Sequence, residues 1–376
     1  MKACAKPDSI LLSCVLALLL LSVLMVSSAS LSVAEIRYGD PFQIIQHWLV
    51  YIPIGLVLLW ITSRVDPVWW KSAALPLVVV AFLVMLGVLL LGQRINGATR
   101  WFSLFGMSFQ PVEILKPMVV VYMAYYLSSF TERLNHFATG LAPMLIILMV
   151  SVMLLMLQPD FGNAVLLTLT CIGLWFLGGV PFRHLGGMAL MALPLALVAI
   201  IAEPYRAKRF FSFTDPWADP LGSGYQLAQS MIAFGSGGLT GTGLGQGVQK
   251  LFYLPEGFTD FIAAVMGEEL GLPGTAALIA IFAVMIGRSF YLVYHHEDAF
   301  QRLLVCGCIM LIGFSFMINM GAVMGMIPTK GMPIPFLSYG GSALFGNCIL
   351  MGVILSVQRH AKSTVSNSYS SPRLVT

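Results

Sequence analysis

Long apolar runs, separated by short polar connections, occupy most of this 376-residue chain. A run of about 20 apolar residues crosses the hydrocarbon core of a bilayer as an α-helix, whereas a transmembrane β-strand shows only alternation over about ten residues. The chain is 58% hydrophobic and 10% charged, whereas soluble domains carry roughly 25% charged residues. These features exclude a soluble globular domain and predict an all-α polytopic membrane protein.

We count ten runs of spanning length, with ends defined to about three residues. The first run follows Lys2 and Lys6 and mimics a signal peptide, but its length predicts a retained first helix. The eighth is expected to be either bent or longer than one crossing. The ten runs cover 10–30, 43–62, 73–92, 111–128, 141–158, 162–180, 185–203, 260–293, 303–325 and 341–357.

The distribution of Lys and Arg predicts the orientation of the chain. With ten spans both termini share a side, and most cations of the connecting segments lie on that side. The short loops opposite hold only Arg37, Arg94, Arg100 and Lys330. Because cytoplasmic loops are enriched in Lys and Arg, both termini are expected in the cytoplasm.

The polar segments define one domain and a tail. Residues 1–360 are expected to form a single integral-membrane domain, with a large external loop at about 204–259. Residues 361–376 are Ser-rich and polar, and are expected to be a disordered cytoplasmic tail. The six cysteines lie in apolar runs or near the N-terminus. This placement indicates neither a disulfide framework nor a zinc site, and nothing resembles a nucleic-acid footprint.

The expected external face carries cations against the usual charge bias. Such clusters are typical of phosphate or diphosphate binding, and contact with lipid headgroups is the alternative. Lys330 lies within the Pro-rich segment 328–335, whose rigidity favours a defined ligand site. We therefore expect a diphosphate to be held by Arg206, Arg209, Lys250 and Lys330, whereas Lys208 is expected to face solvent.

The external segment also contains a short apolar stretch and a glycine-rich one. Residues 225–234 have apolar side chains at helical spacing and are expected to form a short interfacial or re-entrant helix. Residues 235–247 form a glycine-rich stretch that could turn backbone N–H groups onto a phosphate. It matches neither a P-loop nor a dinucleotide fingerprint. A flexible turn packed on the bundle is the alternative.

Acidic residues mark the edges of several spans, where ionisable groups are costly and invite a functional interpretation. Asp260 ends the polar loop and precedes an apolar helix, which suits either a general base or a helix cap. Glu113 and Lys116 share a helical face and are expected to form an ion pair within the membrane, with direct chemistry as the alternative. Asp160 could cap the next helix.

Several sequence blocks, in order from about residue 92 to 357, resemble the SEDS family of bacterial shape, elongation, division and sporulation proteins. The blocks are Gln110-Pro-Val-Glu-Ile-Leu-Lys116, Gln158-Pro-Asp160, Gly222-Ser-Gly-Tyr-Gln226, Leu254-Pro-Glu-Gly-Phe-Thr-Asp-Phe-Ile262, Gly267-Glu-Glu-Leu-Gly271 and Pro335-Phe-Leu-Ser-Tyr-Gly-Gly-Ser342. Within the family, 202–206, 248–251 and 328–331 look more like the division member than the elongation member.

The resemblance implies a peptidoglycan glycosyltransferase that polymerises lipid II at the outer face of the bacterial cytoplasmic (inner) membrane. It implies Asp260 as the catalytic carboxylate, Glu113 and Lys116 as a cavity pair, and an assisting divalent cation, Mg²⁺ or Mn²⁺. It also implies a class B penicillin-binding protein transpeptidase and other divisome membrane proteins as partners, at the division septum. Further residues expected near the cavity are Asp160, Glu268, Glu269 and Ser338.

The sequence departs from the family pattern next to the expected base. Phe258 stands where division proteins commonly have His, so no role can be carried over to that position. Ala263 replaces a usual Phe and Ala343 a usual Ser. Two other functions remain open: a lipid II flippase, and a non-catalytic scaffold that recruits the transpeptidase. A flippase needs a charged path to the cytoplasmic side, whereas the unusual residues of this chain are external.

Overall fold

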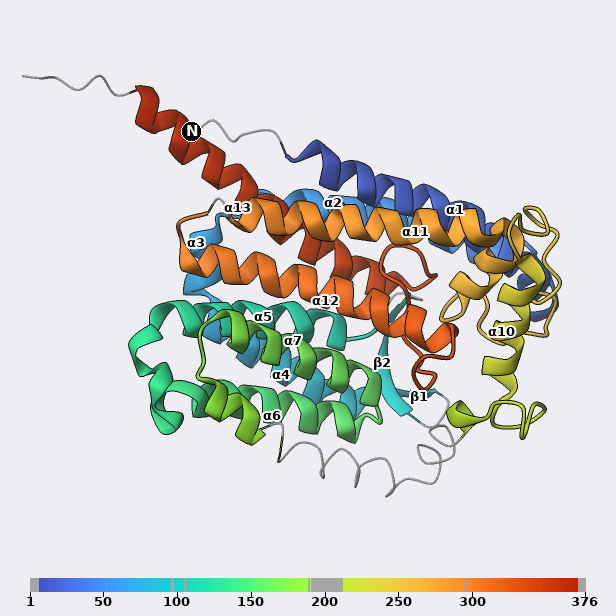
Figure 1. The fold of residues 1–376 in the computed structure, drawn as a ribbon, viewed down its shortest axis with the longest axis horizontal. Coiled ribbons are helices and arrows are strands. Elements are labelled where there is room, and N and C mark those ends of the chain that lie inside the picture. Colours follow the sequence, from blue (N-terminus) through green and yellow to red (C-terminus); the bar gives the residue numbers. More distant parts are fainter. Residues whose placement is uncertain are drawn as a thin grey trace, which may run out of the picture.

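The computed structural model describes residues 7–95, 98–104, 107–188, 190, 212–294 and 296–370. Its long helices lie side by side in an elongated bundle (Figure 1). The helices are α1 (Ser9–Tyr38), α2 (Gln43–Thr62), α3 (Pro67–Ser72), α4 (Ala74–Leu91), α5 (Val112–Ser129), the 3₁₀ helix η1 (Thr131–Asn135), the π-helix η2 (Phe137–Leu141), α6 (Ala142–Leu157), α7 (Phe161–Leu177), α10 (Tyr225–Gly237), α11 (Ile262–Tyr294), α12 (Ala299–Val323) and α13 (Gly341–Ser370).

The described helices identify the chain as a multi-pass membrane protein. Among the described residues, seven stretches of helix are long and apolar enough to cross a membrane: Ser9–Tyr38, Gln43–Thr62, Ala74–Leu91, Phe137–Leu157, Ile262–Tyr294, Ala299–Val323 and Gly341–His360. Helix α7 is apolar but shorter, and α5 carries Glu113 and Lys116 near its start. Each expected span corresponds to a described helix except 185–203, most of which lies outside the described residues.

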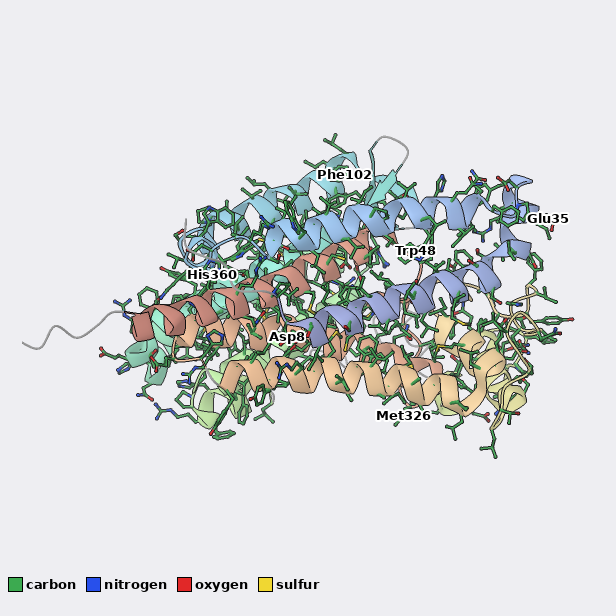
Figure 2. All side chains as sticks on the ribbon, turned by 90° about the horizontal axis from the view of Figure 1, so that it is seen from above. Asp8, Glu35, Trp48, Phe102, Met326 and His360 are labelled. Carbon is green, nitrogen blue, oxygen red and sulfur yellow. The ribbon has the colours of Figure 1, made fainter. Side chains whose placement is uncertain are left out.

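The bundle has two distinct ends. The start of α1 and the far part of α13 lie toward one end, here called the terminal end (Figure 1). There Asp8 caps α1 and forms a 2.7 Å ion pair with Arg288 of α11. Figure 2 shows Asp8 and Glu35 at opposite ends of α1. The opposite end, here called the loop end, carries α10 and the strands (Figure 1).

Helix α11 is bent at Gly271, which has φ 64° and ψ −154° and is followed after one residue by Pro273. Glycine adopts this backbone conformation without a Cβ clash, whereas other residues rarely do. The part before the bend is buried on all faces. At ~1.5 Å per residue, the part from Leu272 to Tyr294 is about 34 Å long and can span a bilayer by itself. The expectation that 260–293 is bent or longer than one span is confirmed.

A small antiparallel sheet between α4 and α5 was not predicted. It consists of β1 (Gln93–Ile95), β2 (Ala98–Leu104) and β3 (Met107–Phe109) in the order β1-β2-β3. Arg94 pairs with Thr99 between the first two strands, and Phe102 pairs with Phe109 between the last two. The sheet lies at the loop end, so it adds no element that spans the membrane.

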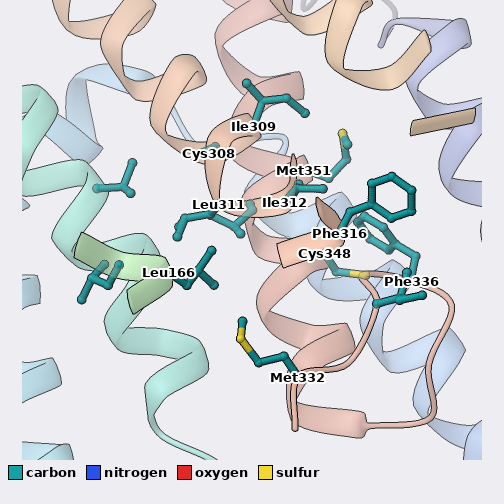
Figure 3. Packing of buried hydrophobic residues seen from close by; sticks show 14 of the residues in the cluster. Leu166, Cys308, Ile309, Leu311, Ile312, Phe316, Met332, Phe336, Cys348 and Met351 are labelled. Carbon is teal, nitrogen blue, oxygen red and sulfur yellow. The ribbon is translucent and has the colours of Figure 1, made fainter. Parts of the chain in front are cut away.

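Helix α12 lies at the centre of the bundle and packs against α5, α7, α11 and α13. Its Phe316 stacks on Phe282 of α11 with ring centroids 3.9 Å apart. Phe336, from the connection between α12 and α13, lies beside Phe316 and Cys348 (Figure 3). Helices α2 and α13 pack closely, with Gly55 in contact with Leu344 and Cys348. Many large apolar side chains on the outer helices stay exposed, as expected of surfaces that face lipid.

The expected tail and the expected external loop can be compared with the structure. Helix α13 continues to Ser370, so the first part of the expected tail, 361–370, is helical rather than disordered. Residues 361–370 contain neither Gly nor Pro, so nothing in them breaks the helix before Pro372. Residues 371–376 lie outside the described residues. Of the expected external loop, 204–211 lie outside them too, and the predicted helix at 225–234 is α10.

Candidate active site

Asp260 lies at the loop end, two residues before the start of α11, and is half-buried. Two loops meet there: residues 251–261, here the Asp260 loop, and residues 324–340, here the Lys330 loop. A Cβ atom built on Gly331 would lie 3.0 Å from Oδ2 of Asp260. The absence of a side chain at Gly331 therefore lets the Lys330 loop approach the carboxylate closely.

Phe258 packs where the family pattern has histidine. It is buried, its ring contacts Tyr339 with centroids 5.7 Å apart, and its carbonyl accepts a 3.1 Å hydrogen bond from the Tyr339 N–H. The phenyl ring thus joins the Asp260 loop to the Lys330 loop by packing. It offers no proton acceptor beside Asp260.

Lys330 lies over the first residue of α7. Its Nζ is 5.1 Å from the centroid of the Phe161 ring, a cation–π contact. The neighbouring Gly162 lets the loop pack closely, since a Cβ there would lie 3.1 Å from Sδ of Met332. Burial lowers the pKa of Lys330 below its usual value of 10.5. A poorly solvated ammonium of this kind binds an anion more strongly than one in water.

A buried polar network runs from the loop end into the bundle between α5 and α7. Nζ of Lys116 donates to Glu113 at 2.8 Å and to Oδ1 of Asn163 at 3.3 Å. Nδ2 of Asn163 donates to Asp160 at 2.9 Å, and Nε2 of Gln110 donates to the same Asp160 oxygen at 3.3 Å. Asp160 also caps α7. The expected Glu113–Lys116 ion pair is therefore present, and its charges are satisfied within the membrane.

Lys250 is held by a different set of residues. Its Nζ lies 2.6 Å from Glu269 and 2.7 Å from Oγ of Ser28 on α1. Ser28 in turn donates to Glu269 at 2.7 Å, and both charged side chains are buried. In the structure Lys250 therefore contacts Glu269 and Ser28, and no contact with the Lys330 loop is seen among the described residues. A role for Lys250 in binding diphosphate stays a prediction.

The glycine-rich stretch packs on the buried first part of α11. Glu268 accepts from the N–H of Val248 at 2.8 Å and of Gln249 at 3.1 Å. Glu269 accepts from the N–H of Gly245 at 3.0 Å. A Cβ on Gly237 would collide with the carbonyl of Gly267. Within the stretch, the N–H groups of Thr242 and Gly243 donate to the carbonyls of Glu268 and Glu269. These N–H groups and that of Gly245 are therefore used within the protein, and the packed turn is the arrangement observed.

The remaining expected site residues are also located. Ser338 is buried, and its Oγ accepts the N–H of Ile334 at 2.8 Å, which closes a turn of the Lys330 loop. Arg206, Lys208 and Arg209 lie outside the described residues. The residues that sequence reasoning missed are polar or aromatic side chains within apolar runs or loops: Ser28, Gln110, Phe161, Asn163 and Asn319.

Comparison with known proteins identifies the family. The family described as cell cycle protein, which groups FtsW, RodA and SpoVE, matches residues 8–363. The chain belongs to this family. The expected resemblance to SEDS proteins is confirmed, and the relatives support the expected similarity to the division member FtsW.

Curated relatives and solved structures agree with this family. The probable peptidoglycan glycosyltransferase FtsW of Coxiella burnetii is 44% identical over 93% of this chain and 95% of its own length. The same-named protein of Geobacter metallireducens is 36% identical over 97% of this chain and 98% of its own length. A chain from a peptidoglycan synthase complex, described as coordinating polymerization and crosslinking, aligns with a TM-score of 0.77 at 27% identity, over 94% of this chain and 98% of that chain. Thermus thermophilus RodA aligns with a TM-score of 0.70 at 26% identity, over 94% and 97%.

Proposed function

We propose that this chain is a peptidoglycan glycosyltransferase that polymerises lipid II, a disaccharide-pentapeptide on undecaprenyl diphosphate. The observation that carries the proposal is the meeting of two loops at the loop end, where the Asp260 carboxylate packs against the loop that carries the half-buried Lys330. The names of the full-length FtsW relatives support the same reaction. A carboxylate and an ammonium, which can serve as the base and the cation of the proposed reaction, lie on these two loops.

In the proposed reaction Asp260 acts as the general base. It takes the proton from the 4-hydroxyl of the acceptor sugar, whose oxygen attacks the anomeric carbon of the donor. The bond from that carbon to the diphosphate breaks, and the lipid diphosphate leaves with the bonding electrons. Lys330 stabilises the negative charge that develops on the leaving group. Arg206, Arg209 and Lys250 remain proposed diphosphate ligands on the evidence of sequence alone.

A divalent cation is part of the proposal. Within the described residues, no cluster of three or more His, Cys, Asp or Glu side chains is placed to hold a metal ion. Mg²⁺ commonly binds through one or two carboxylates together with substrate phosphates. The Asp260 carboxylate could supply one ligand to such a cation, which would be brought by the diphosphate and would neutralise its charge.

The proposal includes a partner and a location. The chain acts in the bacterial cytoplasmic membrane, with both termini in the cytoplasm and the loop end outside, at the division septum. Its partners are a class B penicillin-binding protein that crosslinks the strands and other divisome membrane proteins. The structural relative from a complex that coordinates polymerization with crosslinking supports such a pairing.

One observation favours the flippase alternative. The network from Gln110 through Asp160 and Asn163 to Lys116 and Glu113 places polar groups inside the bundle, as a transport path requires. Polymerisation of labelled lipid II by the purified chain with its partner transpeptidase separates the functions. Glycan strands support the transferase, whereas lipid movement without strands supports the flippase, and neither product supports the scaffold.

The charge of Lys330 should set an alkaline limit to activity. A lysine loses its charge as pH rises through its pKa, and burial places the pKa of Lys330 below 10.5. The polymerisation rate should therefore fall on the alkaline side at a lower pH than an exposed lysine would give. In Lys330→Arg the charge persists, so the fall should move to higher pH. Initial rates measured from pH 7 upward test this, and identical profiles for both proteins would remove Lys330 from the reaction.

A methyl group at Gly331 should disturb the base. In Gly331→Ala the new Cβ would lie 3.0 Å from Oδ2 of Asp260, so the carboxylate or the loop must shift. We expect the rate to fall roughly tenfold, since a 1 Å misplacement can cost on the order of 100-fold. Gly287→Ala, in open space on α11, is the matched control and should keep the rate. Equal rates for both variants would show that Gly331 does not constrain Asp260.

A further inference from the structure

The two loops of the site are tied to the same buried side chain of α12. Asn319 is 1% exposed. Its Nδ2 donates to the carbonyl of Asp260 at 2.7 Å and to the carbonyl of Met332 at 2.5 Å. An amide nitrogen carries two N–H groups in one plane, so the directions of the two acceptors are fixed relative to each other. Asn319 therefore joins the Asp260 loop and the Lys330 loop at one point.

Both carbonyls belong to backbone next to the chemistry. Asp260 carries the proposed base, and Met332 follows Lys330 by two residues. Gly331, between Lys330 and Met332 in the sequence, packs against the Asp260 carboxylate. Because a side chain starts from its own backbone, the amide that fixes the Asp260 peptide group also fixes where the carboxylate begins, and it holds the Lys330 loop two residues after Lys330.

A second link between the loops is made by Tyr339 and Phe258. The N–H of Tyr339 donates to the carbonyl of Phe258 at 3.1 Å, and their rings are in contact. That link holds the loops together without contacting residues 330–332. Asn319, in contrast, contacts the backbone of Asp260 itself and of Met332, close to Lys330 in the sequence.

The donors of Asn319, rather than its acceptor, are used. Its Oδ1 has no hydrogen-bond donor among the described residues, whereas both contacts made by Nδ2 are short. We propose that Asn319 is a positioning residue for glycosyl transfer. By donating to two backbone carbonyls, it fixes the position of Asp260 relative to the Lys330 loop. This inference rests on the proposed function.

The test is Asn319→Leu, which is close to asparagine in size and lacks both N–H donors. Per folded molecule, kcat for lipid II polymerisation should fall about 100-fold, because the base moves relative to the reacting groups. KM should change by less than about threefold, because substrate binding by the rest of the site is intact. Ser315→Ala is the matched control. Ser315 lies one turn earlier on α12, and its Oγ donates to the carbonyl of Pro333 in the Lys330 loop alone, at 3.4 Å. It should keep the kcat of the unchanged chain.

A kcat within twofold of the Ser315→Ala value would overturn the proposal, as would a loss that only follows the loss of folded protein. If Asn319→Leu does not accumulate, Asn319→Ser is judged by the same two outcomes, since its hydroxyl can supply only one donor. The unchanged chain and Asp260→Asn are run in the same assay. Strands from the first and none from the second keep the proposed function, whatever Asn319 does.

Discussion

Asp260→Asn should lower the rate of lipid II polymerisation by about 10²- to 10⁴-fold, the usual contribution of a general base. Asparagine has nearly the same shape but cannot accept the proton of the sugar hydroxyl. The backbone carbonyl of residue 260 would still accept from Asn319, so the loop should stay in place. Initial rates of strand formation in the purified complex, with thermal unfolding measured in parallel, check this prediction.

The control for Asp260→Asn is in the same loop. Glu256 is exposed, and its Oε2 accepts from the hydroxyl of Thr259 at 2.8 Å. Glu256→Gln removes one negative charge from the Asp260 loop without touching the Lys330 loop. It should keep most of the activity. Normal strand formation by folded Asp260→Asn would take Asp260 out of the mechanism.

Breaking the buried ion pair between Lys250 and Glu269 should give the largest effect on stability. Glu269→Gln leaves the ammonium of Lys250 buried with a neutral partner, and breaking a buried pair in this way costs about 3–5 kcal/mol. The loss should be strong because Glu269 also holds Ser28 of α1 and the N–H of Gly245. Thermal unfolding of the detergent-solubilised protein should shift to clearly lower temperature.

The double variant Lys250→Met with Glu269→Gln separates charge from packing. It removes both charges, so much of the lost stability should return. If the single variant unfolds at the temperature of the unchanged chain, the pair does not stabilise the loop end. If Lys250→Met, paired with Glu269→Gln, is stable and raises KM for lipid II strongly, Lys250 binds substrate as the sequence predicts.

The membrane helices could be predicted from the sequence because each requires a long apolar run. The bend in α11 was also predictable, since the run 260–293 exceeds one crossing and contains Gly271 and Pro273. The small sheet was missed because its strands lie in a short connection with little apolar alternation. The dipeptide Asn96-Gly97, which separates β1 from β2 in the sequence, is a hairpin signal that could have revealed it.

The site was predictable only where charge stood out locally. Asp260 and Lys330 are ionisable groups at the edges of apolar segments, and such groups attract attention. Asn319 and Asn163 are single amides within helices, and only the fold shows which groups they contact. Glu268 and Glu269 were expected near the cavity, but they accept from backbone N–H groups in the glycine-rich stretch and just after it, about 20 residues away in sequence. That kind of long-range pairing has no local signal.

The most direct measurement supplies labelled lipid II to the purified chain together with its partner transpeptidase, whose crosslinking activity is blocked. The account predicts glycan strands of many disaccharides, with one lipid diphosphate released for each bond formed and with formation dependent on Asp260. Lipid II that crosses a vesicle membrane without joining into strands, or strands that form equally well from Asp260→Asn, would contradict it.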